Sequence, residues 1–160
     1  PIPTLGATTK KFIDEDPLYL HPNNMLEWIS HDNGKTYNGC HFWSNFEIAS
    51  LDFWRSDAYT KYFEALDEAG GFFYERWGDA PVHSIAAALF LDKDEIHFFE
   101  DIGYFHVPFH NCPVDPEVRK ERRCNCDPNQ DFTWRPHSCT TKYFTVKGLK
   151  RPKGWENFTS

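Results

Sequence analysis

GGFFYERWGDAPVHS, residues 70–84, joins the end of one predicted helix to the start of another. The paired glycines end the first helix, since glycine readily adopts the left-handed backbone found at helix C-termini. Asp79 lies where it could cap the second helix, with Pro81 in its first turn. Between these signals, aromatic rings alternate with acids, an arginine and a histidine, a composition typical of a concave site for a polar, hydroxyl-rich ligand such as a sugar. The stretch therefore predicts both the layout of the fold and a candidate binding site.

Helices and strands are expected to alternate on either side of this stretch. Ser56 precedes a run whose apolar residues recur on one helix face, so we expect it to cap the helix that follows. The patterns predict helices over Thr8–Asp14, Met25–Ser30, Asp57–Glu68 and Ala80–Leu91, strands over Cys40–Ile48 and Glu95–Phe99, and a short extended stretch over Phe72–Glu75. Such alternation favours an α/β fold, with residues 1 to about 103 as its α/β part and residues from about 104 to 160 as an irregular, cysteine-rich region.

Length and composition favour one folded domain with no membrane segment. The chain has 160 residues, of which 18 % are aromatic, and it contains no apolar run long enough to cross a bilayer. Residues 1–118 hold 20 acidic and 7 basic residues, whereas residues 119–160 hold 4 and 10. The acidic bulk argues against nucleic acid as a partner, and the basic end is interpreted as a solvated face.

Four of the five cysteines lie within 28 residues, in a segment rich in proline, asparagine and aspartate. Because this segment has little apolar periodicity to hold it, disulfides formed in an oxidising compartment are the preferred interpretation. Zinc is the alternative, through Cys124 and Cys126 with Cys112, Cys139 or His110, although a spacing of one residue is poor for a zinc knuckle. The odd count leaves one thiol free or paired elsewhere.

Two carboxylates are candidates for chemistry. Glu47 lies inside the apolar stretch predicted as a strand, where an acid is costly unless it is paired or used. The alternative is an edge position that faces solvent. Asp79 has an ordinary role as a helix cap, but a helix N-terminus also favours anionic ligands, so the two roles are compatible.

The remaining candidates are basic or paired groups. Glu75 and Arg76 are most simply an ion pair, and His83, one turn after the start of the second helix, is interpreted as structural. His106 follows the strand predicted over Glu95–Phe99, on a loop where a neutral imidazole could bind a transition metal.

Two long blocks resemble the fungal α-1,2-mannosyltransferases of glycosyltransferase family 15. They are Tyr37–Ile48 (YNGCHFWSNFEI) and Gly70–Ser84, and shorter blocks at Asp101–Tyr104, Cys124–Asp127 and Gly148–Trp155 resemble the same family. The resemblance covers nearly the whole chain. It implies the C-terminal half of a GT-A-like, Rossmann-related catalytic domain with a disulfide-stapled, loop-rich tail.

The resemblance also implies an activity and a setting. The family's enzymes transfer mannose from GDP-mannose to mannose hydroxyls of O-glycans, N-glycans or glycolipids, retain the α configuration and need a divalent cation, typically Mn²⁺. They are type II membrane proteins of the Golgi whose catalytic domain faces the lumen, so an anchor is expected upstream. The sequon Asn157-Phe158-Thr159 agrees with a secretory setting.

Roles for individual residues follow from the same resemblance. Glu47 matches the carboxylate proposed as nucleophile, Asp79 a second active-site acid, and His106 the metal-ligand histidine. Substrate-binding roles are implied for Trp43, Tyr74, Glu75, Arg76 and Trp77.

Two other classes stay open from the sequence. One is an inactive remnant of such an enzyme, which should bind neither GDP nor Mn²⁺. The other is a secreted, disulfide-stapled sugar-binding module, which should bind mannose without nucleotide or metal.

Overall fold

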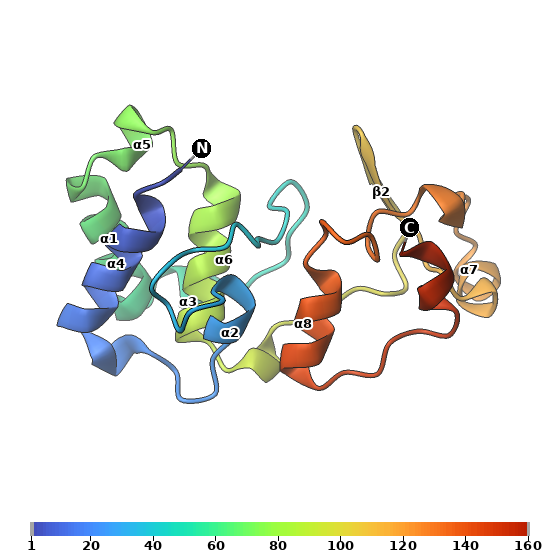
Figure 1. Cartoon of the computed structure of the whole chain (residues 1–160), viewed down its shortest axis with the longest axis horizontal. Helices are drawn as coiled ribbons and strands as arrows, with labels where there is room; N and C mark the ends of the chain where they lie inside the picture. The colour runs from blue at the N-terminus through green and yellow to red at the C-terminus, as the bar shows by residue number, and fades with distance from the viewer. Residues whose placement is uncertain (1, 160) are drawn as a thin grey trace. The chain divides into compact units, whose positions relative to one another are not determined.

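The computed structural model describes residues 2–159 and separates into two compact units, the first ending at Ile96 and the second beginning at His97 (Figure 1). The sequence-based division near residue 103 stays a prediction. The first unit contains α1 (Leu5–Glu15), η1 (Pro17–Tyr19), α2 (Leu26–Ile29), α3 (Leu51–Trp54), α4 (Asp57–Glu68), α5 (Gly71–Tyr74), α6 (Asp79–Phe90) and η2 (Lys93–Glu95). The second contains β1 (Tyr104–His106), β2 (Phe109–Asn111), α7 (Pro116–Arg122), η3 (Pro128–Gln130), α8 (Thr140–Lys147) and η4 (Trp155–Phe158).

Helix α6 is the most deeply buried helix of the first unit. Its sequence is apolar around most of its circumference, which is the composition of a helix covered on several sides. It packs against α2 and α4, and α4 in turn packs against α1. Its buried side chains are Val82, Ser84, Ile85, Ala86, Ala88, Leu89 and Phe90.

An aromatic cluster joins three helices of this unit. The rings of Phe12 on α1, Tyr62 on α4 and Phe90 on α6 have centroids 5.5–6.0 Å apart. Tyr62 is fully buried, and its hydroxyl lies 3.0 Å from the Thr9 hydroxyl, so its polar atom is satisfied. Burial raises the pKa of the Tyr62 hydroxyl, which therefore stays protonated.

The predicted helices are confirmed and the predicted strands are not. Asp57–Glu68 is helical over the same residues, and Ser56 Oγ accepts a hydrogen bond from the Tyr59 N–H at 3.3 Å as its cap. Residues 40–48 form an irregular loop instead of a strand, and Lys93–Glu95 is a 3₁₀ turn where a strand was expected to begin. Phe72–Tyr74, expected to be extended, belongs to the short helix α5.

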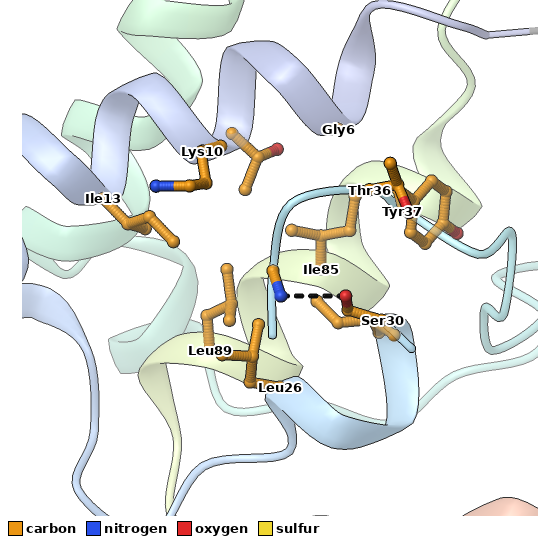
Figure 2. A pocket seen from close by; sticks show the side chains of 12 residues that line it. Gly6, Lys10, Ile13, Leu26, Ser30, Thr36, Tyr37, Ile85 and Leu89 are labelled. Atoms are coloured by element: carbon orange, nitrogen blue, oxygen red, sulfur yellow. Dashed lines mark hydrogen bonds between the residues drawn. The ribbon is translucent and has the colours of Figure 1, made fainter. Parts of the chain in front are cut away.

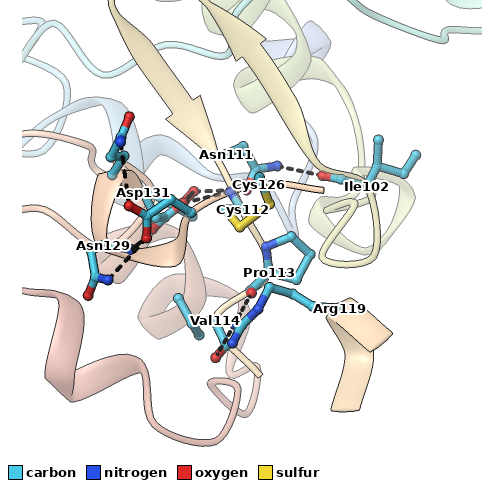
Figure 3. Close-up of a disulfide and its surroundings, with 12 residues drawn as sticks. Ile102, Asn111, Cys112, Pro113, Val114, Arg119, Cys126, Asn129 and Asp131 are labelled. Carbon is cyan, nitrogen blue, oxygen red and sulfur yellow. Dashed lines mark hydrogen bonds between the residues drawn. A yellow bond between two sulfur atoms is a disulfide. The ribbon is translucent and has the colours of Figure 1, made fainter. Parts of the chain in front are cut away.

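The second unit is organised around a disulfide and a buried carboxylate (Figure 3). Strands β1 and β2 pair antiparallel, with Phe105 opposite His110. Cys112, directly after β2, is bonded to Cys126, which confirms that a disulfide staples this region. Asp131 is 1 % exposed and accepts hydrogen bonds from the Cys112 N–H at 2.9 Å and the Thr133 hydroxyl at 2.7 Å.

The zinc alternative is wrong for this region. Cys112 and Cys126 are oxidised to each other, so neither is a thiolate ligand. No cluster of three or more potential metal-binding side chains occurs within residues 2–159. Nor does any helix in this described part combine the length and apolar character needed to cross a membrane.

Candidate functional site

Two hydrogen bonds join the loop that precedes helix α3 to helix α6. The Phe42 N–H donates to Ser84 Oγ at 2.7 Å, and the Ser44 hydroxyl donates to Asp79 Oδ2 at 2.5 Å. Asp79 is the first residue of α6, while Gly78 occupies the N-cap position. The expectation that Asp79 caps the helix is therefore wrong, because its carboxylate reaches across to the loop.

The surroundings of Asp79 favour its ionised form. The hydrogen bond from Ser44 is the main cause that lowers the pKa of Asp79 below its usual value of 3.8, with partial burial acting in the opposite direction. Backbone N–H groups at the start of α6 and the nearby His83 lower this pKa further. Asp79 is thus an anion at neutral pH.

Glu47 and His83 form the second contact between this loop and α6. His83 Nδ1 lies 3.5 Å from Glu47 Oε2, and the two side chains are 30 % and 38 % exposed. The imidazole packs on Trp54, with ring centroids 4.5 Å apart, and meets Tyr59 edge-on at 6.0 Å. Burial, and secondarily the charge of Glu47, raise the pKa of Tyr59. Glu47 is therefore a paired carboxylate beside aromatic rings.

We call Ser44, Glu47, Asp79 and His83 the α6 cluster. It contains both carboxylates that the sequence analysis proposed as catalytic, since Asp79 lies on α6 and Glu47 contacts His83 on the same helix. Two carboxylates held by a hydroxyl and an imidazole can stabilise positive charge, act as nucleophile, or take part in acid–base chemistry.

Glu75 and Trp77 form a separate group, which contacts Thr4 directly before α1. Glu75 accepts hydrogen bonds from the Thr4 hydroxyl at 2.8 Å and from the Trp77 indole N–H at 2.9 Å. These two donors, the indole first, lower the pKa of Glu75. Trp77 is buried, 5 % exposed, against Gly71. Their observed contacts thus fix the turn after α5.

The other predicted substrate-binding residues differ in exposure. Tyr74 is 89 % exposed. Arg76 is exposed with a left-handed backbone, φ 60°, and the expected ion pair between Glu75 and Arg76 is replaced by the bonds of Glu75 to Thr4 and Trp77. Trp43 is half-buried in the loop beside Ser44. Their roles toward a substrate stay predictions.

His106 lies in the second unit and is exposed. It is the last residue of strand β1, opposite Phe109 on β2, and not on a loop after a strand at Glu95–Phe99 as expected. Its imidazole can supply one ligand to a metal ion. Since no cluster of three ligands occurs in the described part of the chain, a complete site needs further ligands from a nucleotide or from other protein residues.

Four residues of this site were not proposed from the sequence. Ser44 carried no signal of its own, and His83 was interpreted as structural although its spacing from Asp79 places both on one face of a helix. Trp54 and Tyr59, which hold the imidazole, lie on α3 and α4.

A small hollow elsewhere in the first unit lacks the features of a catalytic site (Figure 2). It is bounded by α1, α2 and α6 and by the loop over residues 34–37, and it is open to solvent. Ser30 Oγ accepts a hydrogen bond from the Gly34 N–H at 2.8 Å across it. Its lining contains no carboxylate, is mainly apolar and includes no residue of the α6 cluster.

Comparison with known proteins gives consistent matches. Residues 1–148 match the sequence profile of the glycolipid 2-alpha-mannosyltransferase family. Glycolipid 2-alpha-mannosyltransferase 1 of Candida albicans is 72 % identical over 99 % of this chain and 37 % of its own length. Alpha-1,2 mannosyltransferase KTR1 of Saccharomyces cerevisiae is 62 % identical over 98 % of this chain and 40 % of its own length.

Solved structures agree with these matches. The crystal structure of core-mannan synthase A from Aspergillus fumigatus, in its Mn/GDP form, superposes with a TM-score of 0.78 at 46 % identity, over 92 % of this chain and 42 % of that one. The mannosyltransferase Ktr4p of S. cerevisiae in complex with GDP gives a TM-score of 0.78 at 40 % identity, over 99 % and 42 %. The likeness confirms the fold class implied by the sequence resemblance, and the chain spans about two fifths of the length of these relatives.

Proposed function

Since the chain belongs to the glycolipid 2-alpha-mannosyltransferase family, we propose that it forms part of a retaining α-1,2-mannosyltransferase that uses GDP-mannose. The acceptors are mannose hydroxyls on O-linked or N-linked glycans or on glycolipids. The observation that carries this proposal is the α6 cluster, in which the Asp79 and Glu47 side chains contact a serine hydroxyl and a histidine ring, in a chain 40 % identical to a mannosyltransferase solved with GDP.

The chemistry required of Glu47 follows from stereochemistry. GDP-mannose and the product are both α, so the configuration at the anomeric carbon is retained. In a double displacement, a Glu47 oxygen attacks that carbon as its bond to the diphosphate breaks and GDP leaves. The acceptor hydroxyl then attacks the same carbon, loses its proton and releases Glu47. In front-face transfer, Glu47 remains a carboxylate and stabilises the positive charge that develops on the sugar.

The other members of the α6 cluster would support that role. Asp79 stays ionised through its bond from Ser44, and it can accept a hydrogen bond from a sugar hydroxyl or stabilise positive charge. The exposed aromatic ring of Tyr74 and the half-buried Trp43 offer surfaces on which sugar rings can stack. Glu75, Arg76 and Trp77 stay candidates for substrate binding.

We assign His106 as one ligand of a divalent cation, with Mn²⁺ as the expected ion. The Mn/GDP form of the related core-mannan synthase supports this assignment. When bound, the cation would offset negative charge on the diphosphate. Residues 2–159 contain no cluster of three potential metal ligands, so His106 would supply one ligand and the others would come from outside this part of the chain.

We also propose that the protein works on the lumenal side of the Golgi membrane. The disulfide between Cys112 and Cys126 supports a compartment that allows oxidation. The family match favours a transferase over a secreted sugar-binding module, and binding of GDP and Mn²⁺ separates an active transferase from an inactive remnant.

The direct test is an assay of the complete protein with GDP-mannose and a mannoside acceptor. We expect GDP release together with a new α-1,2-linked mannose, identified by NMR of the product. Activity should require a divalent cation. A complete, folded protein that binds mannose but transfers none from GDP-mannose would refute the proposal.

A further inference from the structure

We propose that His83 is a positioning residue for Glu47. This inference rests on the proposed function, because it gives a purpose to the orientation of the Glu47 carboxylate. Nδ1 of His83 lies 3.5 Å from Glu47 Oε2, at the long end of the hydrogen-bond range, where its N–H can direct which way the carboxylate faces.

The imidazole is itself fixed by three elements. It projects from α6, packs on Trp54 from α3 with the two rings tilted by 36°, and meets Tyr59 from α4 at 70°. A ring held on two sides by aromatic neighbours has little freedom to turn. Its Nδ1 is therefore held at a defined position, from which it faces the Glu47 carboxylate.

The loop around Glu47 is not held by its own burial. The flanking side chains are exposed, 53 % for Phe46 and 74 % for Ile48. Apolar packing of the Ile48 side chain therefore contributes little to placing Glu47, whereas polar contacts join this loop to α6, and the contact with His83 is made by the Glu47 carboxylate itself. A nucleophile or charge-stabilising group that is displaced by about 1 Å loses much of its effect.

A positioning role and a packing role of His83 predict opposite orders of kcat for two variants of the complete enzyme. Phenylalanine at position 83 keeps an aromatic ring between Trp54 and Tyr59 but has no hydrogen-bonding nitrogen. Asparagine loses the ring but can place its amide nitrogen near the position of Nδ1. If His83 positions Glu47, His83→Phe should lower kcat by about 10- to 100-fold with little change in KM for GDP-mannose. His83→Asn should then recover a large part of the lost kcat.

A double mutant separates this inference from the proposed function. If His83 acts through Glu47, adding His83→Phe to Glu47→Gln should lower kcat no further. A loss in Glu47→Gln without any loss in His83→Phe would overturn the positioning role and leave the function standing. Full activity of Glu47→Gln would refute the function itself. Unfolding of His83→Phe, or an activity above that of His83→Asn, would indicate packing and overturn the inference.

A different observation supports a second inference, at the end of the chain. Asn157 is exposed in the turn η4 and begins the sequon Asn157-Phe158-Thr159. The surrounding turn is held by other groups, since the Arg151 guanidinium lies 4.5 Å from the Trp155 ring centroid and the Thr159 hydroxyl donates to the Glu156 carbonyl at 3.1 Å. A glycan on Asn157 would therefore displace none of these contacts.

We infer that Asn157 is N-glycosylated in the lumenal setting proposed above. Its Nδ2 would form a bond to the anomeric carbon of a lipid diphosphate-linked oligosaccharide, losing a proton as the lipid diphosphate leaves. In the complete protein made in a yeast, peptide-N-glycosidase should convert Asn157 to aspartate, detected by mass spectrometry of the peptide that follows Lys153. Thr159→Ala should abolish this conversion and Thr159→Ser should preserve it. An unmodified Asn157 in the wild type would overturn the inference.

Discussion

The Ser44 hydroxyl and the Asp79 carboxylate are 2.5 Å apart and join the loop before α3 to the first residue of α6. This bond keeps Asp79 ionised at the candidate site, and it also restrains the loop that carries Glu47. Both tasks depend on the charge of Asp79. The ionisation of Asp79 therefore affects both the stability of the fold at low pH and the geometry of the candidate site.

Ser44→Ala should destabilise the protein in a pH-dependent way. Because the folded-state pKa of Asp79 is lowered, this contribution is fully present above the ordinary value of 3.8 and is lost as pH falls through the folded-state pKa. We expect a loss of about 1 kcal/mol near neutral pH, at the low end for a charge-assisted bond because Asp79 is exposed.

Urea denaturation near neutral pH and below the folded-state pKa of Asp79 would measure this difference. Ser56→Ala is the matched control, because the Ser56 hydroxyl accepts from a backbone N–H at 3.3 Å and involves no carboxylate. Its cost should be similar at both pH values. An equal pH dependence in the two variants would contradict the role of the Ser44–Asp79 bond.

Glu47→Gln should abolish most of the transferase activity of the complete protein. We expect kcat to fall by a factor on the order of 10³ or more while GDP affinity stays near that of the wild type, because the lost charge acts mainly in the transition state. Glu68→Gln, on the exposed surface of α4, is the control and should keep full activity. Steady-state kinetics and GDP titration give both quantities, and a Glu47→Gln variant with most of its activity would exclude the role.

The sequence predicted elements whose signals are local and missed those that depend on distant partners. Helix α4 matches its predicted bounds because Ser56, its cap, adjoins the helix. The loop over residues 40–48 has strand-like composition, but Phe42 and Ser44 bond to Ser84 and Asp79 on α6, and these partners could not be identified from sequence spacing. Tertiary hydrogen bonds therefore decided its conformation against local propensity.

The candidate site was predictable to a similar extent. Glu47 and Asp79 were named from the sequence, and the structure brings each into the α6 cluster. The contact between Glu47 and His83 could not be derived from the sequence, because the two residues are 36 positions apart and come from a loop and a helix. Asp79 and His83 lie one turn apart on α6, so their shared face was visible, but which residue it faces was not.

Gly71→Ala should destabilise the first unit. A Cβ atom at this position would clash with Cε2 of the buried Trp77, so backbone or indole must move, at a cost of about 2 kcal/mol or more. Gly78→Ala is the matched control, since its Cβ would meet only Pro81 at 3.9 Å and its cost should stay below about 1 kcal/mol. Equal midpoints of urea unfolding for the two variants would contradict the tight contact at Gly71.

Removing the disulfide should destabilise the second unit. Cys112 and Cys126 are separated by 14 positions, and closing a loop of this length stabilises a fold by about 3 kcal/mol in the chain-entropy account. Cys112→Ser should therefore lower the unfolding midpoint strongly, while Cys124→Ser, at the free cysteine, should change it little. Alkylation without reductant, followed by mass spectrometry, should label Cys124; labelling of Cys112 in the folded wild type would refute the pairing.

His106→Ala should weaken binding of GDP in the presence of Mn²⁺ and leave metal-independent binding of the acceptor unchanged. Loss of one neutral ligand from the metal commonly reduces metal affinity by about 10-fold or more. His110→Ala is the matched control, because His110 lies on the partner strand of the same hairpin and its ring packs 4.5 Å from that of Phe105. It therefore reports on damage to the hairpin alone. Calorimetric titration of GDP into the complete protein, with and without Mn²⁺, distinguishes the two effects. If His110→Ala lowers the Mn²⁺-dependent affinity and His106→Ala does not, the hairpin contributes a different ligand and the assignment of His106 is wrong.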